Sequence, residues 1–174
     1  YIRLKLLVYY FIKLNRIKEV TKMTSHVTFK QGVKECIPTL LGYVGIGLSF
    51  GIVAASQHFS IIEILLLCLL VYAGAAQFII CALVATGTPI SAIVLTTLIV
   101  NSRFFLLSMT LAPNYKDYGI WNRLGLSSIL TDETFGVAIT PHLKGEKIND
   151  RWLHGLNLTA YSFWALASIV GALL

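Results

Sequence analysis

The chain has 174 residues, of which 56% are hydrophobic and only 13% are charged, and its formal net charge is +6. Together with a mean hydropathy of +0.76, this composition leaves too little polar surface to cover a water-soluble globule. It excludes a soluble domain and predicts a chain that lies in a lipid bilayer.

The first 22 residues need separate treatment, because the chain begins at Tyr1 and its first methionine is Met23. Their apolar run, residues 6–12, is short for the core of a signal peptide and lacks a small-residue cleavage site. We expect residues 1–22 either to be read-through from upstream sequence or to form a basic amphipathic helix on an anionic membrane face. Residues 23–174 are expected to form the membrane domain, truncated at its C-terminal end.

Five apolar stretches of about the length that crosses a bilayer follow along the chain. Roughly 20 helical residues span the ~30 Å hydrocarbon layer, because each residue rises ~1.5 Å. The stretches are residues 37–55, 61–85, 90–112, 121–140 and 153–174. The fourth is the weakest, because it carries Arg123, Asp132 and Glu133. It forms either a crossing helix with a buried polar face or a re-entrant segment.

Backbone hydrogen bonding decides the secondary structure of these stretches. The lipid core holds no water, so every backbone N–H and C=O group must pair internally, and runs of this length must be helices. A β-barrel needs segments of ~10 residues that alternate apolar and polar side chains, and none of these runs alternates. The predicted fold class is an all-α polytopic membrane bundle with about five transmembrane segments and helix breaks near Gln77 and Asp132.

Orientation follows from the lysines and arginines that flank the stretches, because positively charged loops stay in the cytoplasm. A cytoplasmic N-terminus and five crossings put Lys30, Lys34, Lys144, Lys147 and Arg151 inside, and Lys116 and Arg123 outside. The links 56–60 and 86–89 carry no lysine or arginine. This distribution favours a cytoplasmic N-terminus and weakly favours a true crossing for residues 121–140.

Small residues form a face on the first stretch, which contains Gly42, Gly45, Gly47 and Gly51. The last two have the GxxxG spacing that lets two helices approach closely. In the second stretch, Gly74 belongs to a run of small residues before Gln77. These glycines predict helix packing, and the alternative is that they loosen the helix around a ligand.

Polar side chains in the middle stretches need partners, because an unpaired amide in hydrocarbon costs several kcal/mol and an uncompensated arginine at least ~2.5 kcal/mol. Gln77 bonds either to a neighbouring helix or to a passing solute. Asn101 and Arg103 lie near the centre of the third stretch, and Asp132 and Glu133 supply compensating anions. The nominal depths of Arg103 and Asp132 differ by ~10 Å, so their direct pairing requires a broken or tilted helix.

Three short motifs are specific in combination. They are the run Tyr-Ala-Gly-Ala-Ala-Gln-Phe at 72–78, Asn-x-Arg at 101–103 and Thr-Asp-Glu-Thr-Phe at 131–135. In this combination and spacing the chain resembles the AzlC-type branched-chain amino acid exporters, the azaleucine-resistance permease family. The resemblance covers residues 23–174 and supports Met23 as the start. The chain departs from the family at Leu107, where many members have a tyrosine, and members are usually longer.

The resemblance implies a multi-pass protein of the inner membrane that exports leucine, isoleucine and valine, driven by the proton-motive force. It also implies a small membrane partner of the AzlD type. No enzymatic activity, cofactor, metal or nucleic-acid partner is expected, because the chain has no phosphate-binding loop and no zinc-protease helix motif. Its cysteines, Cys36, Cys68 and Cys81, have no C-x-x-C spacing and are expected to be reduced thiols.

An exported amino acid is a zwitterion, so its site needs a positive group for the carboxylate, acceptors for the ammonium and an apolar wall for the side chain. We assign the carboxylate to Arg103, and either the ammonium or the coupling proton to Asp132 or Glu133. Neutral hydrogen bonds are assigned to Gln77, Asn101 and Thr131, and the wall to Tyr72, Phe78 and Phe135.

Other interpretations stay open. Arg103 with Asp132 and Glu133 alternatively forms a buried ionic clamp that holds helices together. The chain as a whole is alternatively a non-transporting subunit that assembles a larger membrane complex, a permease for another small solute, or a passive channel. Glu63 is a separate case, because it lies at the start of its stretch and is expected to reach the membrane interface.

Overall fold

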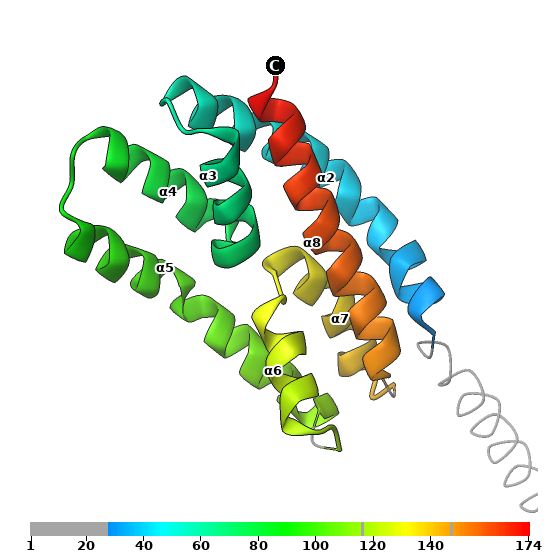
Figure 1. Ribbon diagram of the computed structural model, residues 1–174. Coiled ribbons are helices and arrows are strands. Elements are labelled where there is room, and N and C mark those ends of the chain that lie inside the picture. Colours follow the sequence, from blue (N-terminus) through cyan, green and yellow to red (C-terminus); the bar gives the residue numbers. More distant parts are fainter. Residues whose placement is uncertain (1–27, 116, 147) are drawn as a thin grey trace, which may run out of the picture.

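The computed structural model describes residues 28–115, 117–146 and 148–174, and every regular element in these ranges is a helix. The helices in chain order (Figure 1) are α2 (Phe29–Ser56), α3 (Ile61–Leu66), the π-helix η1 (Leu67–Val71), α4 (Gly74–Ala85), α5 (Ile90–Leu111), the short 3-10 helix η2 (Ala112–Tyr115), α6 (Ile120–Ser128), α7 (Asp132–Leu143) and α8 (Asp150–Ala172). The predicted all-α class is confirmed. The predictions for residues 1–22, Met23, Lys116 and Lys147 lie outside the described residues.

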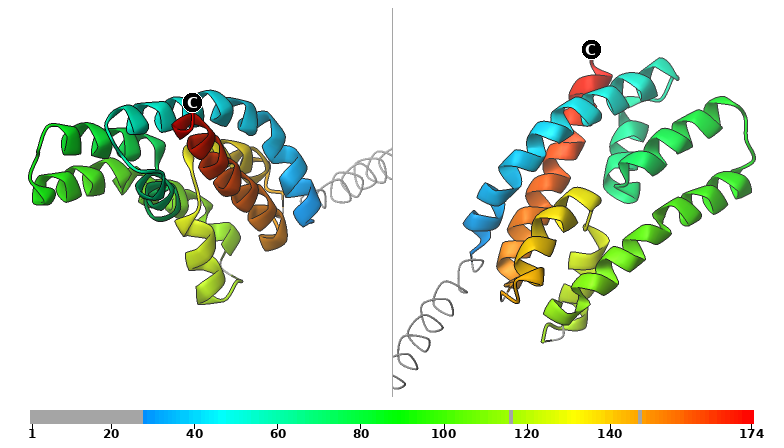
Figure 2. Two further views of the ribbon diagram at one scale, coloured as in Figure 1. Left: turned by 45° about the horizontal axis from the view of Figure 1, so that its top comes forward. Right: turned by 180° about the vertical axis from the view of Figure 1, so that it is seen from behind.

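Two long helices, α2 and α8, pack in parallel along much of their length (Figures 1 and 2). Glycines on both helices make this close approach possible. A Cβ atom at Gly51 would overlap the backbone of Ser168 and Ala172, and one at Gly155 would overlap the backbone of Phe29. Small residues of this kind let two helices pack backbone to backbone, so the pair α2–α8 is the rigid support of the molecule.

The predicted glycine face of α2 is divided in the structure. Gly47 and Gly51 face α8, and a Cβ atom at Gly47 would lie 2.8 Å from the Cβ atom of Ala167. A Cβ atom at Gly42 or Gly45 would meet nothing within 4 Å in the described part of the chain. Only half of this face therefore packs inside the chain.

The second predicted stretch, 61–85, consists of two helical arms. The first arm, α3 with η1, ends at Tyr72, which has a left-handed backbone (φ 41°, ψ 49°), and Ala73 is extended. The chain then reverses, and α4 runs back toward the end at which α3 began (Figures 1 and 2). The break expected near Gln77 lies at Tyr72 and Ala73. A π-helical turn and a left-handed aromatic residue are unfavourable conformations that recur at functional sites.

The fourth predicted stretch, 121–140, is also divided, into α6 and α7. The residues from Ile129 to Thr131 are not helical, and Thr131 is the N-cap of α7. The helix α7 returns toward the end at which α6 began, where His142 Nδ1 lies 2.8 Å from Asn114 Nδ2. The structure thus has the reversing path and not the single helix that the charges weakly favoured. The cause is the reciprocal capping of Thr131 and Thr134, which starts a new helix in mid-molecule.

The two reversing pairs give the chain a repeated plan. The helix α2 is followed by the pair α3–α4, and α5 is followed by the pair α6–α7, with α4 and α7 each 12 residues long. The second unit runs in the opposite direction, so the two pairs enter from opposite ends of the molecule and meet in its middle (Figures 1 and 2). Broken helices that meet between units of opposed direction are a recurrent arrangement in secondary transporters.

Positive side chains gather at one end of the molecule. They are Lys30 and Lys34 at the start of α2, Arg123 at the start of α6, Lys144 just after α7 and Arg151 at the start of α8. Asn122 donates to Asp150 (3.0 Å), which holds the starts of α6 and α8 together. Arg123 therefore lies at the same end as Arg151, and not on the opposite side as expected. The links 57–60 and 86–89 at the other end have no lysine or arginine.

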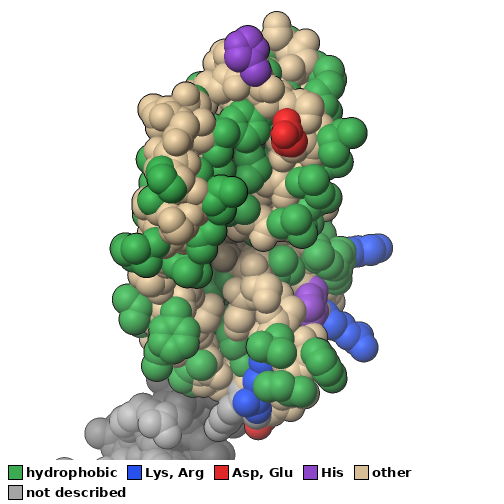
Figure 3. Space-filling model, turned by 60° about the vertical axis from the view of Figure 1, so that its left-hand side comes forward, with side chains coloured by type: hydrophobic (Ala, Val, Ile, Leu, Met, Phe, Trp, Pro, Cys, Tyr) green, Lys and Arg blue, Asp and Glu red, His purple; other side chains and the backbone are tan. Residues whose placement is uncertain are grey.

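Apolar side chains cover much of the remaining surface. Two described helices are long and apolar enough to cross a membrane, namely α2 and the continuous run 90–115. In that run, Leu98 and Ile99 are each 64% exposed. On the face drawn in Figure 3, hydrophobic side chains extend from top to bottom, and lysine and arginine side chains lie at mid-height or below. A lipid-facing helix requires this kind of exposed apolar surface.

Candidate functional site

A cavity of about 300 Å³ lies where the two helix breaks meet. It is lined by Tyr43 and Ile46 of α2, residues 72–75 and Phe78 of the first break and α4, Arg103 and Phe104 of α5, residues 131–133 at the start of α7, and Trp164 of α8. The cavity is within the size range of small-molecule sites. It combines the N-terminal ends of α4 and α7 with charged groups and aromatic rings, and the long helices α2, α5 and α8 all contribute to it.

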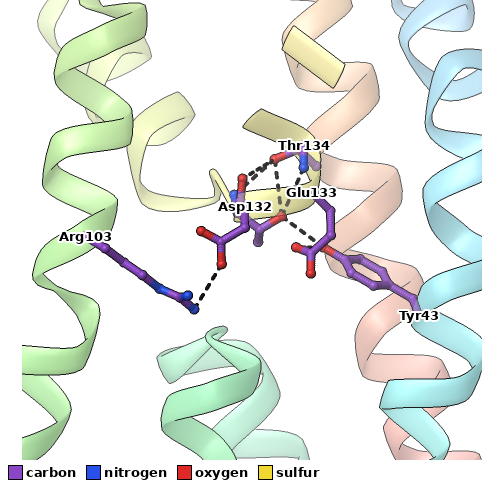
Figure 4. Close-up of polar contacts among 6 residues, drawn as sticks. Tyr43, Arg103, Asp132, Glu133 and Thr134 are labelled. Atoms are coloured by element: carbon purple, nitrogen blue, oxygen red, sulfur yellow. Dashed lines mark hydrogen bonds and ion pairs between the residues drawn. The ribbon is translucent and has the colours of Figure 1, made fainter. Parts of the chain in front are cut away.

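Arg103 and Asp132 form an ion pair across this cavity (Figure 4). The guanidinium Nη2 lies 2.9 Å from Asp132 Oδ2, and each side chain is 44% exposed. The sequence alone gave these residues nominal depths ~10 Å apart along continuous helices. The break before Asp132 removes that offset, because α7 starts a new helix at the level of Arg103.

Tyr43 connects α2 to the start of α7 (Figure 4). Its hydroxyl lies 2.9 Å from Thr131 Oγ1 and donates to Oε2 of Glu133 at 3.1 Å. Thr131 in turn accepts from the backbone N–H of Thr134 (3.3 Å), and Thr134 Oγ1 accepts from the backbone N–H of Thr131 (3.0 Å). The first turn of α7 is therefore fixed from two sides, and its two carboxylates have different partners.

The start of α4 differs from the start of α7, because no side chain in the described part of the chain caps it. Gly74 and Ala75 line the cavity at this point, together with Tyr72. The side chain of Tyr72 is only 7% exposed, and its hydroxyl has no hydrogen-bond partner among the described residues. An uncapped helix N-terminus has free N–H groups and a partial positive charge.

Apolar residues from four helices complete the lining of the cavity. They are Ile46 of α2, Phe78 of α4, Phe104 of α5 and Trp164 of α8. The ring of Trp164 lies against Gly74, where a Cβ atom would come within 3.1 Å of it. Such a wall suits an aliphatic or aromatic side chain, since it offers apolar contact without hydrogen-bonding groups.

Gln77 has partners inside the protein. Its Oε1 accepts from the indole Nε1 of Trp164 (2.9 Å), and its Nε2 donates to Cys68 Sγ (3.5 Å). The side chain is fully buried and does not belong to the lining of the cavity. Of the two readings left open for this amide, the structure has the bond to a neighbouring helix, and Gln77 acts on the cavity by holding Trp164.

The structure brings most of the other predicted site residues together. Those that line the cavity are Tyr72, Gly74, Phe78, Arg103, Thr131, Asp132 and Glu133. Asn101 and Phe135 do not line it, and Asn101 Oδ1 is a buried atom without a hydrogen-bond partner among the described residues. Glu63 does not line the cavity and forms a capping box with Ser60 at the start of α3.

Sequence analysis missed Tyr43 and Trp164, although both line the cavity and their rings contact each other edge to face at 5.2 Å. Aromatic residues are ordinary in apolar helices, so neither has a local signal. The sequence indicates only that each carries a polar group in the middle of an apolar stretch. A buried Tyr hydroxyl or Trp N–H usually has a hydrogen-bond partner, but the sequence does not show which residue that partner is.

No group of three or more His, Cys, Asp or Glu side chains in the described ranges is placed to hold a metal ion. Cys36, Cys68 and Cys81 are buried and unpaired by disulfides.

Comparison with known proteins decides the family. A family model described as "AzlC protein" matches residues 38–174. The chain belongs to the AzlC family. This confirms the resemblance drawn from the three motifs, and the two helix breaks of this AzlC-family chain lie within or directly beside two of them.

Several curated relatives are membrane proteins. Inner membrane protein YgaZ of Escherichia coli is 27% identical over 147 residues, which cover 83% of this chain and 60% of YgaZ. A membrane protein of Helicobacter pylori strain 26695 is 29% identical over 83% of this chain and 63% of its own length. The branched-chain amino acid transport protein AzlC of Bacillus subtilis is 23% identical over 83% of this chain and 57% of its own length.

The AzlC-family chain spans less than two thirds of the length of these curated relatives. No solved structure matches it.

Proposed function

We propose that this chain forms the substrate-binding part of a secondary transporter that exports leucine, isoleucine and valine across the inner membrane. The observation that carries the proposal is the cavity in which two helix breaks, an arginine, two carboxylates and an apolar wall meet. The name of the Bacillus subtilis relative, a branched-chain amino acid transport protein, supports this choice of substrate.

The chemistry of the cavity suits a zwitterion with a branched side chain. Two positive groups face it, the guanidinium of Arg103 and the N-terminus of α4, and Asp132 and Glu133 offer acceptors for an ammonium group. Phe78 and Trp164 supply apolar contact for the side chain. A cavity with all three components selects amino acids over simple amines, carboxylates or sugars.

Proton coupling is assigned to the two carboxylates at the start of α7. Asp132 is held by the permanent charge of Arg103, whereas Glu133 accepts from the neutral hydroxyl of Tyr43. We assign the coupling proton to Glu133, whose partner is a neutral hydroxyl, and the substrate ammonium to Asp132, whose carboxylate lies in the cavity beside Arg103.

The orientation proposed for the chain puts its positive end in the cytoplasm. In this arrangement α2, α5 and α8 cross the membrane, the pair α3–α4 enters from outside, and the pair α6–α7 enters from the cytoplasm. The irregular backbone at Tyr72 and Thr131 lines the cavity, which is where a membrane protein tolerates it. The chain then has three crossings and two re-entrant pairs in place of five crossings.

A small membrane partner of the AzlD type is proposed to complete the transporter, as the family resemblance implies. The glycine face that favoured an assembly subunit is used in part by the chain itself, because Gly47 and Gly51 pack against α8, while Gly42 and Gly45 meet nothing within 4 Å in the described part of the chain.

The test is dipeptide-loaded efflux. Cells expressing the full-length protein with its small partner are fed Leu or Val dipeptides, and internal and external amino acids are followed with and without an uncoupler. We expect uncoupler-sensitive lowering of internal leucine and valine. Unchanged pools with confirmed membrane expression would contradict the proposal and favour another solute or an assembly role.

The same assay tests proton coupling. Glu133→Gln is expected to abolish the response of efflux to the pH gradient, and Asp132→Asn to weaken efflux while leaving some response. Full pH-driven transport by both variants would show that neither carboxylate carries the proton.

A further inference from the structure

The N-terminus of α4 is a positive pole of the cavity that no described side chain neutralises. The helix starts at Gly74 after the extended Ala73, without a side-chain cap. The first N–H groups of a helix lack partners within the helix and together carry about half a positive charge. Because Gly74 and Ala75 line the cavity, these groups are available to an anion that enters it.

A second, independent observation at the same place points to a ligand. Tyr72 lines the cavity and is buried, and its hydroxyl lies near the hydroxyl of Tyr43 without a well-formed hydrogen bond to it or to any other described residue. Buried hydroxyl groups are rarely left unpaired. The ring is held edge to face against Tyr161 at 4.6 Å, on a left-handed backbone (φ 41°). A strained, fixed and unpaired donor beside a free helix N-terminus is arranged to hold an anionic group.

Arg103 is engaged elsewhere. Its guanidinium already bonds the carboxylate of Asp132 at 2.9 Å. A substrate carboxylate at Arg103 would share the guanidinium with Asp132, whereas at α4 it meets N–H groups that no described side chain caps. The side chain of Trp164 closes the other side of Gly74, where a Cβ atom would come within 3.1 Å of the indole ring.

We propose that the carboxylate of the exported amino acid binds at the N-terminus of α4, held by the backbone N–H groups of Gly74 and Ala75 and by the Tyr72 hydroxyl. Arg103 is then a positioning residue that holds Asp132, and not the carboxylate ligand that the sequence suggested. This inference rests on the proposed function. It makes the carboxylate a required group of the ligand.

The first experiment compares leucine with leucinamide, which lacks the carboxylate charge. Binding of radiolabelled leucine to the purified full-length protein with its small partner is displaced by each compound. We expect leucinamide to compete at least tenfold more weakly. Tyr72→Phe is expected to weaken leucine about three- to tenfold and to leave leucinamide unchanged. Tyr115→Phe is the matched control, because that hydroxyl is also buried without a hydrogen-bond partner among the described residues, and Tyr115 does not line this cavity.

The second experiment removes one N–H group of α4. Gly74→Pro deletes the N–H at the first helical position, where proline is tolerated and follows an extended residue. Gly74→Ala adds the same Cβ beside Trp164 but keeps the N–H. We expect Gly74→Pro to bind leucine about tenfold more weakly than Gly74→Ala, with equal binding of leucinamide.

A third variant distinguishes binding of the carboxylate at Arg103 from binding at the N-terminus of α4. Arg103→Gln with Asp132→Asn neutralises the ion pair together. If the carboxylate binds at α4, this double variant keeps the preference for leucine over leucinamide, although its affinity for both falls. Loss of the preference in this double variant would overturn the inference. An undiminished preference in both Tyr72→Phe and Gly74→Pro would overturn it as well. Failure of the unaltered protein to bind leucine at all would instead overturn the proposed function.

Discussion

Tyr43 is the residue that joins the long helix α2 to the polar side of the cavity. Tyr43→Phe keeps the ring contact with Trp164 and removes the hydrogen bonds to Thr131 and Glu133. We expect the free energy of unfolding to fall by about 1–2 kcal/mol and uncoupler-sensitive efflux to fall as well. Thermal unfolding of the purified full-length protein and the efflux assay measure these effects. If Tm and efflux both stay at the level of the unaltered protein, the hydroxyl has no role in the site.

The pair Arg103 and Asp132 serves either a substrate site or a clamp between α5 and α7, and a double-mutant cycle distinguishes the two. Arg103→Leu or Asp132→Leu alone leaves one charge without its partner. We expect a coupling energy of about 1 kcal/mol in Tm-based stability, because both side chains are partly exposed. A clamp would recover stability and efflux together in the double variant. A substrate site recovers stability only, which is the outcome we expect.

The sequence identified single residues when their chemistry conflicted with their surroundings. Arg103, Asp132 and Glu133 stand out in apolar runs, and the structure puts all three in one cavity. Gln77 is equally unusual in an apolar run, but its partner Trp164 lies 87 positions away in the sequence. No local sequence pattern predicts that hydrogen bond. Tyr43 has the same difficulty, because its partners at the start of α7 are about 90 positions away.

Among the elements, the contact between α2 and α8 depends on glycine at defined positions. A Cβ atom at Gly51 would overlap the backbone oxygen of Ser168, whereas one at Gly45 would meet nothing within 4 Å. We therefore expect Gly51→Ala to lower the free energy of unfolding by about 1–3 kcal/mol. Gly45→Ala in the same helix should be neutral or raise it by up to about 1 kcal/mol, because alanine is the better helix former. Equal Tm values for the two variants would contradict this packing.

Element boundaries were predictable where hydropathy changes and unpredictable where the backbone turns within an apolar run. The helix α5 (Ile90–Leu111) agrees with the predicted stretch to within one residue. The reversal at Tyr72 has no proline to mark it, and the break expected near Gln77 lies about five residues earlier, at Tyr72 and Ala73. The break before Asp132 had a local signal in the capping pair Thr131 and Thr134. That signal is weak, since threonine replaces the usual Glu or Gln of a capping box.

For the whole molecule, the reversing pairs change the side of the membrane to which the lysines and arginines are assigned. Five crossings divide the lysines and arginines between both sides of the membrane, with Arg123 opposite Lys144 and Arg151. In the structure these three lie at one end, and the links 57–60 and 86–89 at the other end have no positive charge. The positive-inside rule is thus obeyed more fully by three crossings and two re-entrant pairs than by five crossings.

The two arrangements make opposite predictions for two links, and labelling of single cysteines distinguishes them. Thr88, between α4 and α5, lies outside with re-entrant pairs but inside with five crossings, and Asp117, between η2 and α6, is reversed. We expect a membrane-impermeant maleimide to label Thr88→Cys in intact cells and Asp117→Cys only in inside-out vesicles. The background is the full-length protein with its own cysteines replaced. Gln57→Cys is the control, because both arrangements put that link outside. Labelling of Asp117→Cys from outside, with Thr88→Cys protected, would show that the pairs cross the membrane after all. The cavity would then no longer lie between two broken helices that enter from opposite sides.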